Sequence, residues 1–327
     1  MRLSAEQLSF FKQQGYLILP QILDPDLCEH ARDLLWESLP ENADIIRHQP
    51  STHGGPFSAK DHQDDPVNSR VGYRWQLRQH STDTELLDLL YSETVMAVAA
   101  QLLGEGAVQQ PVAGGSVMGS EGKAWPDGPV DPALSSQGIR GIYATLPYGE
   151  SKDQTTSGAH TDGHPFMLSV VGLIDDCPPG GGAFTVWPGS HQRLYPLFPL
   201  QYDQLRIPFY EHMPSLKGIV QPPEYDATLA EILSDTQPVD CWGRAGDIVL
   251  WHHRLVHAAS ENYSNTIRQA VLADLNRCDL DSLRLNPPYE DMWHDWSPEL
   301  QAADSVISDE FYAQQRCARF AGDTSHE

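Results

Sequence analysis

Positive charge is scarce in this chain. Its 327 residues include 21 Lys and Arg against 45 Asp and Glu, which gives a formal net charge of -24 at neutral pH. A field of that sign repels nucleic acid and anionic membrane surfaces, because both carry dense negative charge. We therefore expect neither as a partner. A well-solvated surface explains the charge equally well, and the charge does not determine the oligomeric state.

Cysteine is also sparse, and its pattern argues against two classes of protein. The cysteines are odd in number and scattered, with no Cys-x-x-Cys pair, at Cys28, Cys177, Cys241, Cys278 and Cys317. A disulfide framework or a structural zinc site would need paired, regularly spaced cysteines. The pattern favours free thiols in a reducing compartment, so we expect a cytoplasmic protein.

Long apolar runs are missing as well. The longest, over 167–174, is too short to cross a bilayer and is interrupted by Ser169 and Gly172. The first fifteen residues do not combine a basic stretch with an apolar one, so we expect no signal peptide. Hydrophobic residues nevertheless make up 40% of the chain, which is ample for a folded core.

The first third of the chain carries helical signals. Ser4 and Asp24 each precede an amphipathic stretch and are candidate N-caps. Pro25, directly after Asp24, suits the first position of a helix. These patterns predict helices over 4–15, 24–39 and 83–103, and a short strand over 16–19.

Residues 41–83 differ from their surroundings. They are rich in His, Asp, Gly, Pro and Ser and show little periodicity, which predicts a long loop anchored by Tyr73 and Trp75. Long loops often cover binding sites as lids. A surface excursion without function is an equally good interpretation, and both stay open.

From about residue 139 the pattern changes to short strands separated by Gly and Pro, which predicts a β-sandwich or barrel. The segment 194–233 is an insertion of mixed character, and Ser308 is a candidate cap for a last helix. No repeat or distinctive linker occurs, so we expect one domain over 1–327, with a helical part about 1–106, a β core about 107–286 and a tail about 287–327. The expected strands cover 141–146, 166–173, 183–186, 247–251 and 268–274.

The strongest functional signal is His160-Thr161-Asp162, followed far downstream by His257 and, eleven residues later, by Arg268. Side chains alternate along an extended chain, so His160 and Asp162 point the same way and Thr161 does not. Two imidazoles and one carboxylate on one face of an iron leave three positions open for a chelating co-substrate and dioxygen. Arg268 would add a planar fork that pairs with a carboxylate.

Each of these residues also has an ordinary structural interpretation. His160 could be a surface histidine, Asp162 a turn residue, and Arg268 an exposed arginine. A lone His-x-Asp motif arises by chance. The motif with a distant histidine and a following arginine is much more specific, so we predict that His160, Asp162 and His257 bind a metal.

Further motifs flank these residues along most of the chain. They are GYLILP at 15–20, GGGAF at 180–184, PGSH at 188–191 and GDIVLW at 246–251. Together with His160, Asp162, His257 and Arg268, they resemble the phytanoyl-CoA dioxygenase family of iron(II)- and 2-oxoglutarate-dependent oxygenases. The resemblance implies a double-stranded β-helix, a cupin-like jelly roll, flanked by helices. It also implies that the first three residues bind iron(II) and that Arg268 binds the distal carboxylate of 2-oxoglutarate.

Other contacts follow less directly. Relatives often have a serine two positions after the distal histidine, where this chain has Ala259, so Ser260, Tyr143 or Thr156 is a candidate for a further bond to 2-oxoglutarate. Candidate substrate contacts lie near the metal motif in sequence or on neighbouring strands, and for the two aromatic ones a core position is an equally good interpretation. They are Arg140, His164, Phe166, Trp251 and His253.

The resemblance implies oxidation of a C–H bond in a small or medium organic molecule, with iron(II), 2-oxoglutarate and dioxygen, and with release of succinate and CO2. Halogenases of this class replace the carboxylate ligand by a small residue, so Asp162 favours hydroxylation, with desaturation or cyclisation next. Two alternatives stay open. One is a jelly-roll metal hydrolase or isomerase using another metal. The other is a binding protein without turnover, which the intact His160, Asp162, His257 and Arg268 disfavour.

Overall fold

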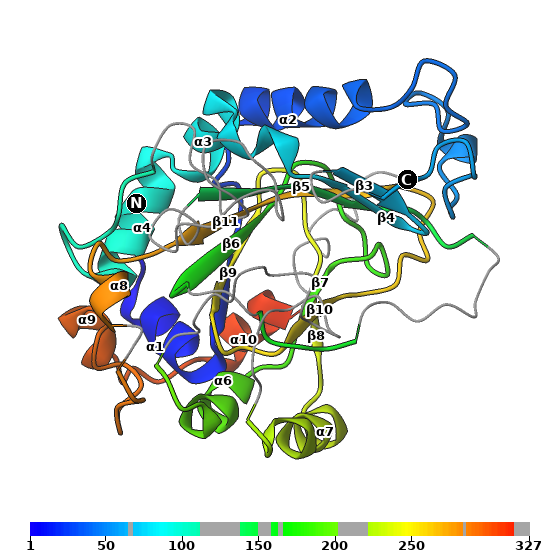
Figure 1. The fold of residues 1–327 in the computed structure, drawn as a ribbon. Coiled ribbons are helices and arrows are strands. Elements are labelled where there is room, and N and C mark those ends of the chain that lie inside the picture. The colour runs from blue at the N-terminus through cyan, green and yellow to red at the C-terminus, as the bar shows by residue number, and fades with distance from the viewer. Residues whose placement is uncertain are drawn as a thin grey trace.

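Antiparallel strands form the centre of the protein, and helices surround them (Figure 1). The computed structural model describes residues 1–64, 68–111, 138–149, 158–162, 166–201, 222–283 and 286–316. Within these ranges the strands form two sheets that lie opposite each other. The expected architecture, mainly β with flanking helices and a double-stranded β-helix at its core, is confirmed.

The larger sheet joins strands from distant parts of the chain, all antiparallel to their neighbours. In spatial order they are β1 (Tyr16–Leu19), β9 (Ile248–His252), β6 (Leu168–Leu173), β11 (Arg268–Leu275), β5 (Gly138–Thr145), β4 (Arg74–Leu77), β3 (Asn68–Val71) and β2 (Gln63–Asp64). The smaller sheet has the order β10 (His257–Ala259), β7 (Phe184–Val186) and β8 (Val239–Cys241). The strands predicted from residue 139 onward all form, whereas β8 and β10 were not predicted.

Helices cover the outside of the larger sheet. In Figure 1, α2 (Pro25–Glu37) and α3 (Thr84–Leu90) lie on one side of it, and the smaller sheet lies on the other. The remaining described helices are α1 (Ala5–Gln14), α4 (Glu93–Leu103), α6 (Ser190–Leu194), α7 (Tyr225–Asp235), α8 (Leu280–Leu283), α9 (Pro298–Gln301) and α10 (Asp309–Arg316). Short 3₁₀ turns occupy Pro50–Thr52, Gln79–Thr82 and Tyr195–Leu197.

The first helix begins and ends where the sequence predicts. The Ser4 and Gln7 side chains each accept a hydrogen bond from the other residue's backbone N–H, forming a capping box. The helix ends at Gly15, whose φ of 78° is left-handed and therefore suits glycine. A Cβ there would lie 2.5 Å from Nδ1 of His191, so the close approach of α1 and α6 also requires glycine.

Two predictions for the N-terminal third are wrong. The helix expected over 83–103 is two helices, because the Ser92 hydroxyl accepts a hydrogen bond from the Val95 N–H and caps a new helix there. The loop expected over 41–83 includes β2, β3 and β4, and β4 pairs with β5. On β4 only Trp75 and Leu77 are buried, which is the alternation of a strand with one face in water.

Buried apolar side chains form one large cluster that includes residues from Leu3 to Leu300 and contributions from both sheets. A smaller cluster lies beside α6 and α7. This continuity supports our proposal of a single domain. Among the described helices, none by itself is long and apolar enough to cross a membrane, and only α3 and α4 taken together, with a 53° bend, meet the length and composition.

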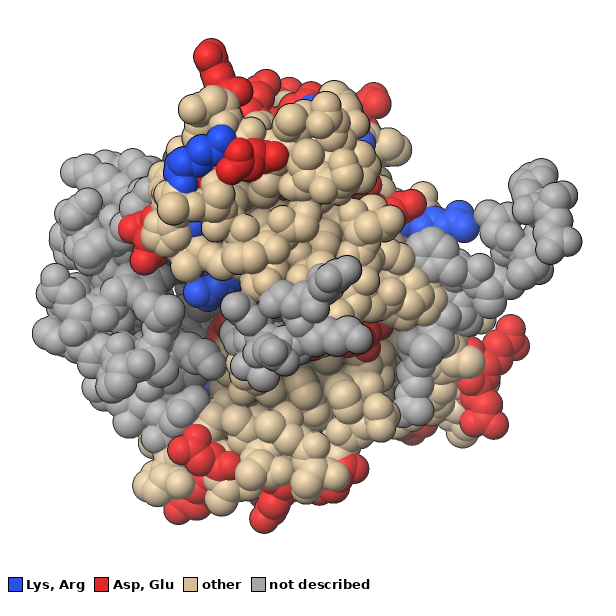
Figure 2. Space-filling model, turned by 90° about the vertical axis from the view of Figure 1, so that its right-hand side faces the viewer, with Lys and Arg blue, Asp and Glu red and all other residues tan. Residues whose placement is uncertain are grey.

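The surface is acidic, as the composition predicts. On the face drawn in Figure 2, Asp and Glu side chains are spread along the upper and lower edges, with few Lys and Arg between them. The four described cysteines are free thiols, and three are buried (Cys28, Cys177 and Cys241). Burial raises the pKa of Cys28 to about 11 and that of Cys177 to about 12, so both thiols are neutral at physiological pH.

Candidate metal centre

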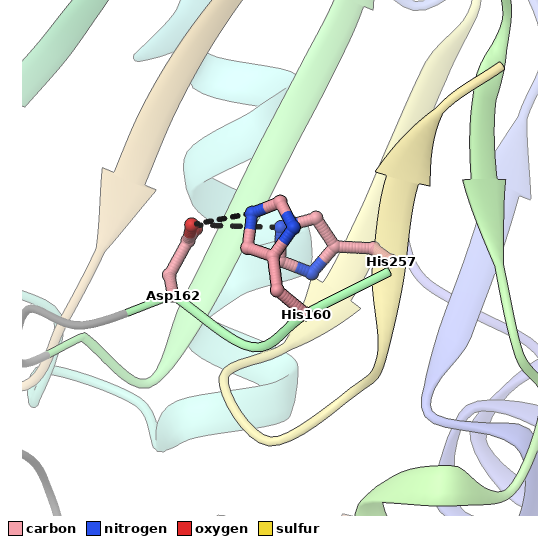
Figure 3. A group of neighbouring side chains, drawn as sticks. All are labelled: His160, Asp162 and His257. Atoms are coloured by element: carbon pink, nitrogen blue, oxygen red, sulfur yellow. Dashed lines mark ion pairs between the residues drawn. The ribbon is translucent and has the colours of Figure 1, made fainter. Parts of the chain in front are cut away.

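The structure brings His160, Asp162 and His257 together, and Figure 3 shows their side chains pointing toward one another. His257 begins β10, and the His160 and His257 backbones exchange two N–H to carbonyl hydrogen bonds of 3.0 and 2.9 Å. Oδ1 of Asp162 lies 3.7 Å from Nε2 of His160 and 3.5 Å from Nε2 of His257. These three atoms lie within 4.8 Å of one another, so a single ion could contact all of them.

Backbone carbonyl groups hold both histidine rings in one orientation. Nδ1 of His160 lies 2.9 Å from the Gly158 carbonyl oxygen, and Nδ1 of His257 lies 3.0 Å from that of Leu255. A carbonyl oxygen only accepts hydrogen bonds, so each Nδ1 must carry the proton and donate. Each Nε2 faces Asp162, and in the neutral ring this tautomer leaves on Nε2 the lone pair with which histidine binds a metal.

Thr161, between the two candidate ligands, turns away from them and is fully buried. Its backbone N–H donates to the Tyr225 hydroxyl at 2.9 Å, and the two hydroxyl groups lie 3.2 Å apart. Tyr225 is the first residue of α7 and is itself buried. The contact fixes the backbone that carries His160 and Asp162.

Arg140 binds the other oxygen of Asp162. Its Nη1 donates to Oδ2 of Asp162 at 2.6 Å, while Nη2 and Nε donate to Oδ1 of Asp274 at 2.6 and 2.9 Å. Burial tends to raise the pKa of the Asp162 carboxyl, but the positive charge of Arg140, helped by His257 and His160, holds that pKa well below its usual range. Asp162 is therefore ionised at neutral pH.

Aromatic rings surround this group of charges. The Trp251 and Phe184 rings lie 5.7 and 5.2 Å from the His257 ring, between centroids. The guanidinium carbon of Arg140 lies 4.8 Å from the centre of the Phe166 ring and 5.5 Å from that of Trp251. Phe166 and Trp251 thus pack in the core beside residues of the site, and their contact with a substrate stays a prediction.

Arg268, the first residue of β11, is buried beside β5. Its Nε donates to the Gly182 carbonyl at 3.0 Å, Nη1 to the Tyr143 carbonyl at 3.2 Å, and Nη2 to the Thr145 hydroxyl at 3.0 Å. Burial lowers its pKa from the usual value, and no carboxylate among the described residues opposes that effect. The side chain keeps one N–H on Nη1 and one on Nη2 beyond these three bonds.

Two of the predicted 2-oxoglutarate contacts have local partners. The Tyr143 hydroxyl accepts a hydrogen bond from Nε of Arg78 at 3.3 Å, and the Ser260 hydroxyl donates to the Ala183 carbonyl at 3.1 Å. Their roles stay predictions. The third, Thr156, lies outside the described residues.

The remaining predicted substrate contacts stay predictions as well. His253 is buried, and its Nε2 lies 3.3 Å from the Gln201 carbonyl oxygen. Burial and the charge of Arg254 hold the pKa of His253 well below its usual range, so this ring is neutral. His164 lies outside the described residues.

Sequence reasoning missed Asp274, Thr145 and Tyr225. A signal existed for Asp274, since a carboxylate between Ala273 and Leu275 in an apolar strand must be buried, and a buried carboxylate needs a cation. No local pattern could have linked Thr145 to Arg268, or Tyr225 to Thr161, because those contacts depend on the fold.

A second group of metal-binding residue types lies on the surface. Nε2 of His30 is 2.8 Å from a Glu85 oxygen and 3.4 Å from one of Asp83. The same Asp83 oxygen accepts two backbone N–H bonds as the N-cap of α3. Ordinary capping and surface ion pairing explain this group.

Comparison with protein families supports the resemblance inferred from the motifs. Residues 147–270 match the family model described as phytanoyl-CoA dioxygenase. The matched range contains His160, Asp162, His257 and Arg268. No curated protein sequence matches the chain.

Several solved structures are similar in fold. The non-heme alpha-ketoglutarate-dependent carbocyclase SnoK from nogalamycin biosynthesis is 19% identical over 89% of this chain and 95% of its own, with a TM-score of 0.48. EctD from S. alaskensis with bound Fe is 19% identical over 88% of this chain and 80% of its own, with a TM-score of 0.49. AviO1 from Streptomyces viridochromogenes Tue57 is 17% identical over 83% of this chain and 94% of its own, with a TM-score of 0.44. At these values, what those proteins bind or catalyse does not carry over to this chain.

Proposed function

Because residues 147–270 match the phytanoyl-CoA dioxygenase family, we propose that this chain is an iron(II)- and 2-oxoglutarate-dependent oxygenase. It oxidises a C–H bond of a small or medium organic molecule, uses dioxygen, and releases succinate and CO2. The observation that best supports the proposal is that the Nε2 atoms of His160 and His257 converge on one oxygen of the ionised Asp162 carboxylate.

The donor chemistry of the three residues fits iron(II). Two neutral imidazoles and one carboxylate, with room for further ligands, are typical of non-heme iron(II) oxygenases. The negative charge of Asp162 offsets part of the charge of a divalent ion, and both histidines already have the tautomer that binding requires. These residue types also accept other divalent ions, so the identity of the metal belongs to the proposal.

The residues of the chain have distinct proposed roles. Iron(II), 2-oxoglutarate and dioxygen supply the oxidising chemistry when bound. Arg268 would bind the distal carboxylate of 2-oxoglutarate, because its two remaining N–H groups are one on Nη1 and one on Nη2, the pair that forms a bidentate fork. A carboxylate there would also neutralise a guanidinium that has no described acidic partner.

The presence of Asp162 narrows the range of reactions that we propose for this chain. Since the carboxylate ligand is present, hydroxylation is the proposed outcome, with desaturation or cyclisation as its variants. The aromatic and charged groups beside the site suit a small organic substrate rather than a polymer. A cytoplasmic location and the absence of nucleic acid and membrane partners stay predictions from composition.

The test is oxygen-dependent succinate formation by the purified protein. With iron(II) and 2-oxoglutarate, the wild type should form succinate in air and none under nitrogen. Asp162→Ala and His257→Ala should form none, whereas Asp235→Ala, an exposed aspartate paired with Arg193, should behave like the wild type.

Two other outcomes would redirect the proposal. Turnover of a hydrolysable or isomerisable substrate with zinc or manganese, without any consumption of 2-oxoglutarate, would point to a metal hydrolase or isomerase. Binding of 2-oxoglutarate without turnover under any metal would point to a binding protein.

A further inference from the structure

A β-bulge in β5 places Arg140 beside the candidate metal ligands. The register between β5 and β11 shifts between Leu272 and Ala273, so Arg140 is an extra residue in its strand. A bulge of this kind changes the direction of a side chain relative to regular alternation. Arg140 can therefore reach Asp162 from the middle of a buried strand.

The bulge depends on the glycine that follows Arg140. Gly141 has a φ of 131°, a region that residues with a side chain rarely adopt. A Cβ at Gly141 would lie 2.3 Å from the Leu77 carbonyl oxygen on the neighbouring strand β4. Both the positive φ and the close approach require glycine at position 141, so the sequence itself specifies the bulge.

Asp274 fixes the guanidinium of Arg140. Asp274 lies on β11, has no exposed surface, and accepts hydrogen bonds from both Nε and Nη2 of Arg140. The guanidinium carbon also lies near the Phe166 and Trp251 rings. With two nitrogens held by Asp274, only Nη1 is directed to Asp162.

The contact gives the two oxygens of Asp162 different environments. Oδ2 accepts a hydrogen bond from Arg140 at 2.6 Å, while Oδ1 faces the Nε2 atoms of His160 and His257. A carboxylate with both oxygens available can bind an ion through both, which would use a coordination position that the co-substrates need.

We propose that Arg140 is a positioning residue: anchored by Asp274, it holds Oδ2 of Asp162 so that only Oδ1 is presented to the metal. This inference rests on the proposed function, since it concerns how the iron site is prepared. It differs from the substrate contact expected for Arg140 from sequence, because here Arg140 acts through Asp162.

Replacing Arg140 alone would remove the cation that neutralises the buried Asp274 carboxylate, and such a variant could fail to fold. The decisive variant is therefore Arg140→Met combined with Asp274→Asn, which keeps the volume and removes both charges. Arg140→Lys keeps one cation that can reach one carboxylate but not both. Arg70→Met is the matched control, because Arg70 is a buried arginine that donates to the Asp61 and Ser38 carbonyls instead.

The experiment titrates each metal-free protein with Co(II), an oxygen-stable probe, by calorimetry and visible absorption, after thermal unfolding shows that the variant is folded. Loss of a partner that orients a metal ligand typically costs about 10–100-fold in metal affinity, and we expect that loss for the double variant, with an intermediate value for Arg140→Lys. The Co(II) spectrum of the double variant should also change, because Asp162 can then bind through both oxygens. Arg70→Met should match the wild type in both respects.

Three results would overturn the inference in different ways. A folded double variant with wild-type Co(II) affinity and spectrum would remove the positioning role. The same result combined with loss of substrate oxidation would make Arg140 a substrate contact. If the wild type itself binds no Co(II), the proposed function fails, and Arg140 has no metal ligand to position.

Discussion

Each of the three candidate ligand side chains has two atoms that could bind a metal, and one of the two is already hydrogen-bonded within the protein. Backbone carbonyls hold Nδ1 of His160 and of His257, and Arg140 holds Oδ2 of Asp162. The three remaining atoms converge because their partners fix the ring and carboxylate orientations. The metal-free protein therefore already has the ligand geometry, and binding requires little reorganisation.

The assignment of the distal histidine can be tested against a neighbour. His257→Ala, like His160→Ala or Asp162→Ala, should abolish iron(II) binding and turnover. His252→Ala should retain both, because His252 is fully buried and stacks on Trp296 at 5.2 Å. Metal titration of both variants is the measurement. Loss of binding in His252→Ala with binding kept in His257→Ala would show that the assignment is wrong.

Arg268→Lys tests the predicted fork. Lysine keeps the charge but cannot make two parallel hydrogen bonds to a carboxylate, and each charge-assisted bond is worth about 1.5–3 kcal/mol. We expect an affinity for 2-oxoglutarate about 10–100-fold lower, since about 1.4 kcal/mol corresponds to a factor of ten. Calorimetric titration of the metal-loaded protein measures it, with Arg70→Lys as control. Unchanged affinity in Arg268→Ala would exclude this role.

At the scale of elements, the sequence predicts what local chemistry determines. Helix α1 was predictable because Ser4 caps it and Gly15 ends it, and β9 because a continuous apolar run follows Asp247. The His160 and Asp162 pair was predictable because alternation places both side chains on one side. These signals lie within a few residues of one another along the chain.

The parts that were not predictable depend on pairing between distant segments. Strand β3 reads NSRV and resembles a loop, because only Arg70 of the four is buried. The direction of Arg140 depends on a register shift against β11, which no local pattern records. The break between α3 and α4 was visible only as Ser92, a possible cap inside an otherwise continuous helical pattern.

Gly141→Ala tests the bulge. The substitution should lower the free energy of unfolding, because a Cβ cannot lie 2.3 Å from the Leu77 carbonyl oxygen, and should weaken Co(II) binding by displacing Arg140. Gly72→Ala is the control, since Gly72 also has a positive φ of 59° but no atom within 4 Å of a Cβ there. Gly72→Ala should lower the free energy of unfolding by only about 1–2 kcal/mol, the cost of a left-handed backbone for a residue with a side chain. Equal urea midpoints for the two variants would contradict the clash.

Hydrogen exchange can decide whether residues 41–62, the part of the predicted lid over 41–83 that precedes β2, cover the site. The N–H groups of β4 pair with β5 within the sheet and should exchange slowly with and without substrate. If the preceding segment covers the site, its amides should gain protection when substrate joins metal and 2-oxoglutarate. Identical exchange in both states would mean a surface excursion, or a segment that is already closed.

At the scale of the whole molecule, three buried histidines from distant parts of the sequence lie together: His191 of α6, His252 of β9 and the adjacent His253. The His252 ring lies 5.3 Å from that of His191 and 4.3 Å from that of His253. Burial lowers the pKa of His191 to about 4, and burial with neighbouring positive charge holds the pKa values of His252 and His253 well below the usual range. The folded protein therefore keeps all three neutral.

This arrangement predicts a loss of stability in mild acid. The unfolded chain takes up protons near pH 6.5 and the folded chain does not, so stability is full above that pH and falls as pH drops toward 4. Three such groups give a slope of up to about 4 kcal/mol per pH unit. Urea unfolding at several pH values between 7.5 and 5 measures this slope of the free energy of unfolding against pH.

Two variants test whether the buried histidines cause the loss of stability in acid. His191→Gln should make the slope shallower, whereas His62→Gln, at an exposed position, should leave it unchanged. Equal slopes in the wild type and His191→Gln would contradict the assignment to the buried histidines.

The most direct test of the iron and 2-oxoglutarate site is an anaerobic titration in two steps. Iron(II) is added to the metal-free protein, and 2-oxoglutarate is then added to the loaded and to the metal-free forms. We predict one iron per chain, bound through His160, Asp162 and His257, and 2-oxoglutarate binding that is strong only when iron is present and weak in Arg268→Ala. Equal binding of 2-oxoglutarate with and without iron, or no binding of iron at all, would contradict it.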